Sequence, residues 1–224
     1  MIQDYLQIRN ISIVLLGEFN PAIIQPFWLV DKKLIREIDA KEANIELIHN
    51  EVNKFDLKWV RFEITKERCQ LQTSLESHFE LVRDLVINIF EILKETPIFS
   101  LGINHEYHFA IERDDLYYRF GNNFAPLDNW NGFLNDPKVL NIEIIENNRK
   151  DGLNGRYRIK MQPSDLNLAS QNKLLISIND HFTIDTAKGE NGRKLEMIDT
   201  LKKVWKSSFE RAEQVVNEIW DKTK

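Results

Sequence analysis

A segment of fourteen residues from position 99 to position 112, FSLGINHEYHFAIE, alternates between apolar and polar side chains almost without interruption. Its odd positions are apolar apart from His105, and its even positions are polar or small. Because successive side chains of a strand point to opposite faces of a sheet, one face should cover a core and the other should meet water or a partner. The segment therefore predicts a long antiparallel strand with one solvated face, and it shows no catalytic chemistry.

Hydrophobic periodicity predicts the remaining elements. Strands are expected over 8–16, 44–48, 56–65, 68–73, 138–147, 156–162 and 173–184, and helices over 26–38, 114–120 and 195–220. A further long helix should start at a capping box made by Ser77 and Glu80 and run to Leu93. The fold class predicted is α+β: a mostly antiparallel, twisted sheet of about seven strands with two long helices packed on one face.

Residues 1–224 contain no domain linker, so we expect a single α+β domain. The halves 44–112 and 138–220 have similar element content. The helix precedes the last strand in the first half and follows it in the second, which argues against a true duplication.

Composition narrows the class of protein only slightly. The net charge of −5 gives no basic footprint, so nucleic acid is an improbable partner. Cys69 is the single cysteine, and it is interpreted as a small half-buried residue in a reducing, cytoplasmic protein. The first ten residues do not form a signal peptide, and the apolar run over 11–16 is too short to span a bilayer, so no membrane association is expected.

His105 and His108 form an H-x-x-H motif. Side chains that are three residues apart on a strand point to opposite faces of the sheet. This pair should therefore not chelate zinc, and no metal site is expected. His105 should instead lie in the core with a hydrogen-bond partner.

The polar face of the long strand offers Asn104, Glu106 and His108, and the last strand offers Asn179 and His181. If the two strands were neighbours, these residues could gather into a cluster in which a carboxylate orients a histidine for proton transfer. The alternative is an ordinary solvated strand face, and we favour it because the sequence does not give the strand order.

Aromatic and amide side chains accumulate in an irregular segment after the long strand, and irregular segments of this length are uncommon unless they have a role. The candidate partner- or ligand-binding residues there are Phe120, Asn122, Asn123, Phe124 and Trp130, and a second such segment contributes Phe19 and Trp28. Either group could instead pin its own loop onto the sheet.

Arg156, Arg158 and Lys160 should point outward from one strand, roughly opposite Glu143 and Glu146. A salt-bridged strand face is the favoured interpretation, and contact with nucleic-acid phosphates is the least favoured one.

Several segments resemble a group of uncharacterised bacterial proteins: DLKWVRFEITKERCQLQTS, RDLVINIFEILKETPIFSLGINHEYHF, NWNGFLNDP and ISINDHFTI. The likeness spans most of the chain. The group has no known function, so the resemblance implies a whole bacterial cytoplasmic protein and transfers no catalytic residue.

Two hypotheses of function follow. No phosphate-loop, dinucleotide, nucleophile-elbow or CxxC motif occurs, which favours a non-enzymatic interaction protein without a cofactor. Such a protein would form a homodimer or join a larger assembly, with defence or toxin control as one candidate setting. The alternative is a small-ligand-binding or hydrolytic domain that uses Glu106, His108 and His181.

Overall fold

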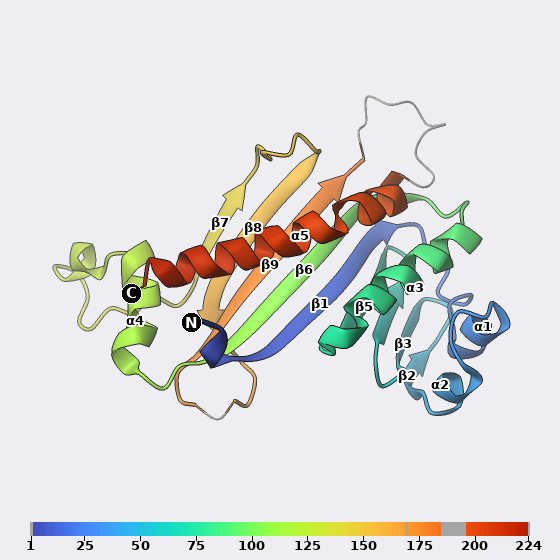
Figure 1. Cartoon of the computed structure of the whole chain (residues 1–224), viewed down its shortest axis with the longest axis horizontal. Helices are drawn as coiled ribbons and strands as arrows, with labels where there is room; N and C mark the ends of the chain where they lie inside the picture. Colours follow the sequence, from blue (N-terminus) through green and yellow to red (C-terminus); the bar gives the residue numbers. More distant parts are fainter. Residues whose placement is uncertain (1, 169, 185–195, 224) are drawn as a thin grey trace.

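The computed structural model describes residues 2–168, 170–184 and 196–223, and within them nine antiparallel strands form one open sheet (Figure 1). The strand order is β2-β3-β4-β5-β1-β6-β9-β8-β7. The strands are β1 (Leu6–Gly17), β2 (Asn44–Ile48), β3 (Val52–Asp56), β4 (Arg61–Thr65), β5 (Arg68–Thr73), β6 (Ile98–Ala110), β7 (Ile142–Glu146), β8 (Gly155–Pro163) and β9 (Lys173–Thr183). The helices are η1 (Ile2–Tyr5), α1 (Pro26–Asp31), α2 (Glu37–Lys41), η2 (Glu76–His78), α3 (Phe79–Ile92), α4 (Asp114–Phe124), η3 (Leu127–Trp130) and α5 (Glu196–Asp221).

Two meanders run inward from the two edges of this sheet. Strands β2 to β5 step from one edge toward β1, and strands β7 to β9 step from the other edge toward β6. Each meander is followed by a helix, α3 or α5, and both helices pack on the same face (Figure 1). The predicted α+β class with its antiparallel sheet is confirmed, with nine strands in the described chain where about seven were expected.

The long alternating segment is the central strand β6. Its odd residues from Leu101 to Phe109 are buried beneath the helices, as the alternation predicts. Antiparallel partners flank it on both sides, with Asn104 opposite Ser12 of β1 and opposite Asn179 of β9. The long strand and the last strand are therefore neighbours, which is the condition that the sequence analysis set for a shared polar cluster.

Helix α5 runs over 26 residues, about 39 Å at 1.5 Å per residue, and covers two core clusters in succession. The first cluster lies beneath α3 and the start of α5, and the second beneath the end of α5 and α4. The Arg9 guanidinium lies over the ring of Phe79 in the first cluster and over that of Tyr107 in the second.

Some predicted boundaries are wrong, and positive φ angles explain two of them. The helix expected over 26–38 is split into α1 and α2, since Lys33 has a φ of 58°. The strand expected over 56–65 contains a turn in which Lys58 has a φ of 68° and Leu57 donates its N–H to the carbonyl of Val60. This turn separates β3 from β4.

The predicted capping box is wrong as well. Helix α3 has His78 as its N-cap, without a side-chain capping bond. Glu80 instead accepts a hydrogen bond from the indole N–H of Trp205 at 2.8 Å, which joins α3 to α5. The short helix expected over 114–120 extends to Phe124 as α4, and the final helix matches its prediction except that position 195 lies outside the described residues.

Candidate functional site

The described helices leave one face of the sheet open, and this face carries the polar residues of β6. Helices α1, α3, α4 and α5 place buried apolar residues in the two core clusters on the opposite face. At the centre of the open face is a hollow of about 300 Å³. Its floor consists of short side chains from β1, β6 and β9, and its walls of long side chains from β5 and β8.

A chain of amide hydrogen bonds organises the floor. Asn179 donates from Nδ2 to the Oδ1 of Asn104 at 2.6 Å, and Asn104 donates from Nδ2 to Ser12 Oγ at 2.9 Å. Asn10 donates to Glu106 Oε2 at 3.2 Å. The structure thus brings together the predicted residues Asn104, Asn179 and Glu106 around one hollow.

Glu106 and His108 lie beside each other at one end of the hollow. His108 Nε2 is 3.9 Å from Glu106 Oε2, and its Nδ1 is 2.8 Å from Ser164 Oγ. The neighbouring His108 ring, and the amide of Asn10, hold the pKa of Glu106 below its ordinary value. Ser164 is buried and also accepts the N–H of Leu166, so its hydroxyl is anchored inside a turn rather than offered to a substrate.

His181 does not join this pair. It lies opposite Gly102, whereas His108 lies opposite Leu175, so six residues of strand separate the two histidines. That spacing is about 20 Å at 3.3 Å per residue, so a cluster that contains both histidines, the less favoured hypothesis, does not form. Burial is the main reason that the pKa of His181 is lowered, followed by the positive charge of Arg156.

A second hollow, of about 660 Å³, lies between α4 and the segment that leads into β7. It is lined by aromatic and aliphatic side chains that include Tyr117, Phe120 and Leu140, with the predicted Asn122 at its wall. Phe120 is buried in the second core cluster and Phe124 packs against it, so both rings pin the segment to the sheet. Asn123 donates to the backbone carbonyl of Lys222 at the end of α5.

Exposed apolar side chains occur on edge strand β7 and in the segment that precedes it. Ile144, 58% exposed, and Ile145 lie on the strand and face opposite sides of the sheet, and Leu140, 75% exposed, comes just before it. Phe133 is 81% exposed, and Trp130 and Leu134 are exposed in the same preceding segment. Of the predicted aromatic candidates, Trp130 is the one whose side chain is exposed. Phe19 lies in the first core cluster against Phe90, and Trp28 packs on the same cluster, so both serve the core.

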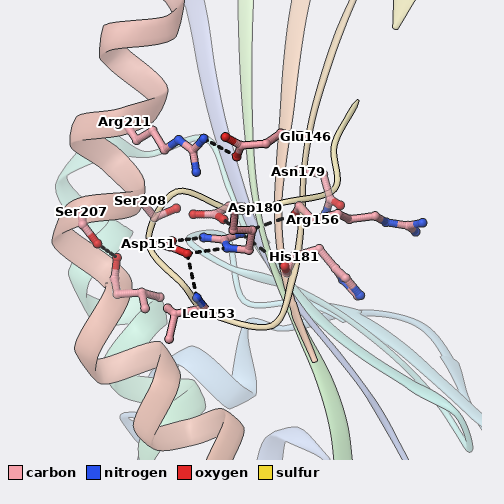
Figure 2. Close-up of polar contacts among 12 residues, drawn as sticks. Glu146, Asp151, Leu153, Arg156, Asn179, Asp180, His181, Ser207, Ser208 and Arg211 are labelled. Carbon is pink, nitrogen blue, oxygen red and sulfur yellow. Dashed lines mark hydrogen bonds and ion pairs between the residues drawn. The ribbon is translucent and has the colours of Figure 1, made fainter. Parts of the chain in front are cut away.

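Sequence reasoning missed a buried charge cluster under α5. The side chains of Arg149 and Asp180 are each 2% exposed, and Arg149 Nη1 donates to Asp180 Oδ1 at 2.6 Å. Arg149 also donates to Asp151 and to the backbone carbonyl of His181. Figure 2 shows this cluster on the α5 side of the sheet, beside the ion pair between Arg211 and Glu146. Arg149 lies in a loop, where side chains follow no period, so no sequence pattern indicates that it pairs with an aspartate of a strand.

The basic strand β8 presents its charges to the open face. Arg158 forms an ion pair with Glu143 at 3.3 Å, as the salt-bridged interpretation expects, whereas Glu146 lies on the opposite face and pairs with Arg211. Figure 2 shows Arg156 and Asn179 pointing away from α5. The thiol of Cys69 is buried rather than half-buried, and burial raises its pKa to about 12, which removes it as a nucleophile.

Two features are absent from the described residues. No group of three or more His, Cys, Asp or Glu side chains in them is placed to hold a metal ion. None of their helices has the combined length and apolar character that crossing a bilayer requires.

No protein-family model matches this chain, and no curated protein matches it either. The resemblance to uncharacterised bacterial proteins stays a prediction. The hypotheses of function therefore depend on the geometry of the two hollows and of the exposed surface at β7.

Proposed function

We propose that this chain is a non-enzymatic assembly subunit, and that a second copy pairs with it along edge strand β7. One observation carries the proposal: Ile144 and Ile145 are exposed on a strand whose outer edge is unpaired in the described chain, and Leu140 is exposed just before this strand. Exposed apolar clusters of this kind mark interaction surfaces, and an unpaired edge is a template for another strand. The cytoplasmic location and the bacterial setting remain expectations from the sequence.

The charges that would normally protect an edge strand are engaged elsewhere. Glu143 pairs with Arg158 on the open face, and Glu146 pairs with Arg211 of α5 on the covered face. Both carboxylates are thereby held within their own sheet. The exposed side chains of β7 that remain to contact an approaching strand are those of Ile144 and Ile145.

An antiparallel pairing of two β7 strands has one register that suits these side chains. With Ile144 on the twofold axis, Glu143 of one copy faces Ile145 of the other, and Glu146 faces Ile142. No two carboxylates stand opposite each other, and two isoleucines meet at the centre, both of which favour a cross-strand pair. The arrangement closes after two copies, as in the commonest homo-oligomers.

The opposite edge of the sheet provides an internal comparison. The pentapeptide NIELI over 44–48 forms β2, and the nearly identical NIEII over 141–145 covers most of β7. Formed ion pairs surround β2, namely Lys58 with Glu42, Arg61 with Glu46 and Lys66 with Glu51. Because ion pairs flank both edges, they do not distinguish the two; Leu47, which corresponds to Ile144 in the shared pentapeptide, is 45% exposed against 58% for Ile144, and we place the interface at β7.

Light scattering on wild-type protein and two matched variants tests the proposal. Wild type should be a dimer, Ile144→Lys should be a monomer because two ammonium groups would meet on the axis, and Leu47→Lys at the other edge should remain a dimer. Circular dichroism confirms that each variant is folded, which is expected since both side chains lie on the surface. A monomeric wild type, or a dimer that only Leu47→Lys disrupts, would contradict the proposal.

The hydrolytic alternative loses support from the register of β6 and β9, since it requires His108 and His181 in one site. Its ligand-binding form is favoured by the hollow on the open face and is developed below.

A further inference from the structure

We propose that the hollow on the open face binds a small zwitterion of the dipeptide class. The site is distinct from the surface at β7, and the inference stands without the proposed dimer. It depends on three features of the hollow: its depth, its polarity and the placement of its charges.

The depth arises from the lengths of neighbouring side chains. Ser12, Asn104 and Ser177 are short, and they lie on the three central strands. Gln70 and Lys160 are long, and they stand on the strands to either side. A row of short side chains between two rows of long ones leaves a trough, and its volume of about 300 Å³ is at the small end for ligand sites. That size suits a molecule of dipeptide length.

The lining is polar and preorganised. Apart from Ile11 and Ile178, every lining residue is polar or charged. The hydrogen bonds from Asn179 to Asn104 and from Asn104 to Ser12 fix the orientation of the amides before a ligand arrives. A site that is already ordered binds with a smaller entropic cost, and a polar lining rejects apolar ligands.

The charges are placed so that a zwitterion can bridge them. Ser177 lies between Glu106 on β6 and Lys160 on β8, with the three residues directly opposite one another across the strands. The two outer strands are about 10 Å apart at about 4.8 Å per strand. No ion pair to Lys160 is found among the described residues, whereas Glu106 is held ionised by Asn10 and His108. An ammonium group at Glu106 and a carboxylate at Lys160 would therefore each find an opposite charge.

A second cation of the lining, Arg68, lies too far from Lys160 to bind the same small ligand. Arg68 stands opposite Leu16 on β1, whereas the row that contains Lys160 meets β1 at Asn10. The two rows are about 20 Å apart along the strands at 3.3 Å per residue, and four strand spacings separate β5 from β8. The inference therefore depends on the charges of Glu106 and Lys160.

Polynucleotides fit the hollow less well. Bases bind to sheets largely by stacking on aromatic rings, and the lining contains none. The carboxylates of Glu106 and Glu143 would also repel phosphates.

Isothermal titration calorimetry with alanyl-glutamate tests the inference, using the full chain. Wild type should bind the dipeptide, and both its N-acetyl form and its α-carboxamide should bind at least about tenfold more weakly, because each lacks one charge. Lys160→Met and Glu106→Gln should each lose about tenfold or more, and Lys160→Arg should restore part of the loss.

Lys54→Met is the matched control, since Lys54 lies on the same open face but pairs with Glu63 at 3.2 Å outside the hollow. It should bind as wild type does. The inference is overturned if wild type does not bind alanyl-glutamate at millimolar concentration, if Lys160→Met binds equally well, or if inorganic phosphate competes as strongly as the dipeptide. Because Ile144→Lys should leave the titration unchanged, failure here is distinguishable from failure of the dimer.

Discussion

His105 illustrates how one polar residue can be placed in an apolar face. The sequence predicted a core histidine with a partner, and its Nε2 lies 3.0 Å from Ser208 Oγ on α5. The ring also contacts Phe209 edge-on. Burial, with a smaller contribution from the positive charge of Arg9, lowers the pKa of His105 to about 3. The ring is therefore neutral at every pH at which the protein is expected to be folded.

This lowered pKa predicts a loss of stability in acid. Below pH 6.5 an unfolded chain would protonate His105, whereas the folded chain would not do so until about pH 3. The contribution of neutral His105 to the free energy of unfolding is thus fully present above pH 6.5. It declines as the pH falls, by about 2 kcal/mol at pH 5. Urea unfolding of wild type and His105→Gln at pH 6.5 and at pH 5 measures this loss. The free energy of unfolding should fall less between the two pH values in the variant than in wild type. An equal fall in both proteins would contradict the assignment.

The buried ion pair between Arg149 and Asp180 could not be predicted from the sequence. Asp180 occupies a core-facing position of β9 between Ile178 and Phe182, where alternation alone predicts an apolar side chain. Its partner comes from the loop between β7 and β8, 31 residues away in sequence. A pair of this kind becomes visible only when the loop is placed.

Among the elements, β6 and α5 were predictable because each has a long, uninterrupted period. The errors lie in short segments, where a single residue with positive φ, Lys33 or Lys58, ends an element that the hydrophobic pattern would continue. The sequence also could not predict strand registers, so whether His108 and His181 meet stayed open. The two strands are neighbours, but their antiparallel register places these histidines far apart.

Gly155 determines how β8 begins. Its φ is +141°, and a Cβ at this position would overlap the backbone carbonyl of His181 on β9. Gly155→Ala should therefore cost at least about 2 kcal/mol of unfolding free energy. Gly132 provides the comparison, because a Cβ there would meet nothing within 4 Å, and Gly132→Ala should stay within about 0.5 kcal/mol of wild type. Thermal or urea unfolding of both variants checks this, and equal losses would refute the role of Gly155.

At the scale of the whole molecule, the sheet has one covered face, one open face and two edges. The sequence predicted the two faces, since alternation reports them directly. It did not predict the edges, because strand order depends on contacts between distant segments. Of the predicted binding residues, Asn104 and Asn179 meet in the open hollow, Trp130 is exposed at the end of η3, and Phe19 belongs to the core.

The central claim is that two copies pair through β7, and a disulfide across the twofold axis tests it most directly. In the proposed register, residue 144 of one copy faces residue 144 of the other at about 5 Å between Cα atoms, a separation that a disulfide can bridge. Cys69 is buried with a pKa raised to about 12, so an introduced cysteine would be the reactive thiol in the described chain. Mild oxidation of Ile144→Cys should give a nearly complete covalent dimer, while Leu47→Cys should stay monomeric on a non-reducing gel. Absence of the Ile144→Cys cross-link, or equal cross-linking of both variants, would contradict pairing through β7.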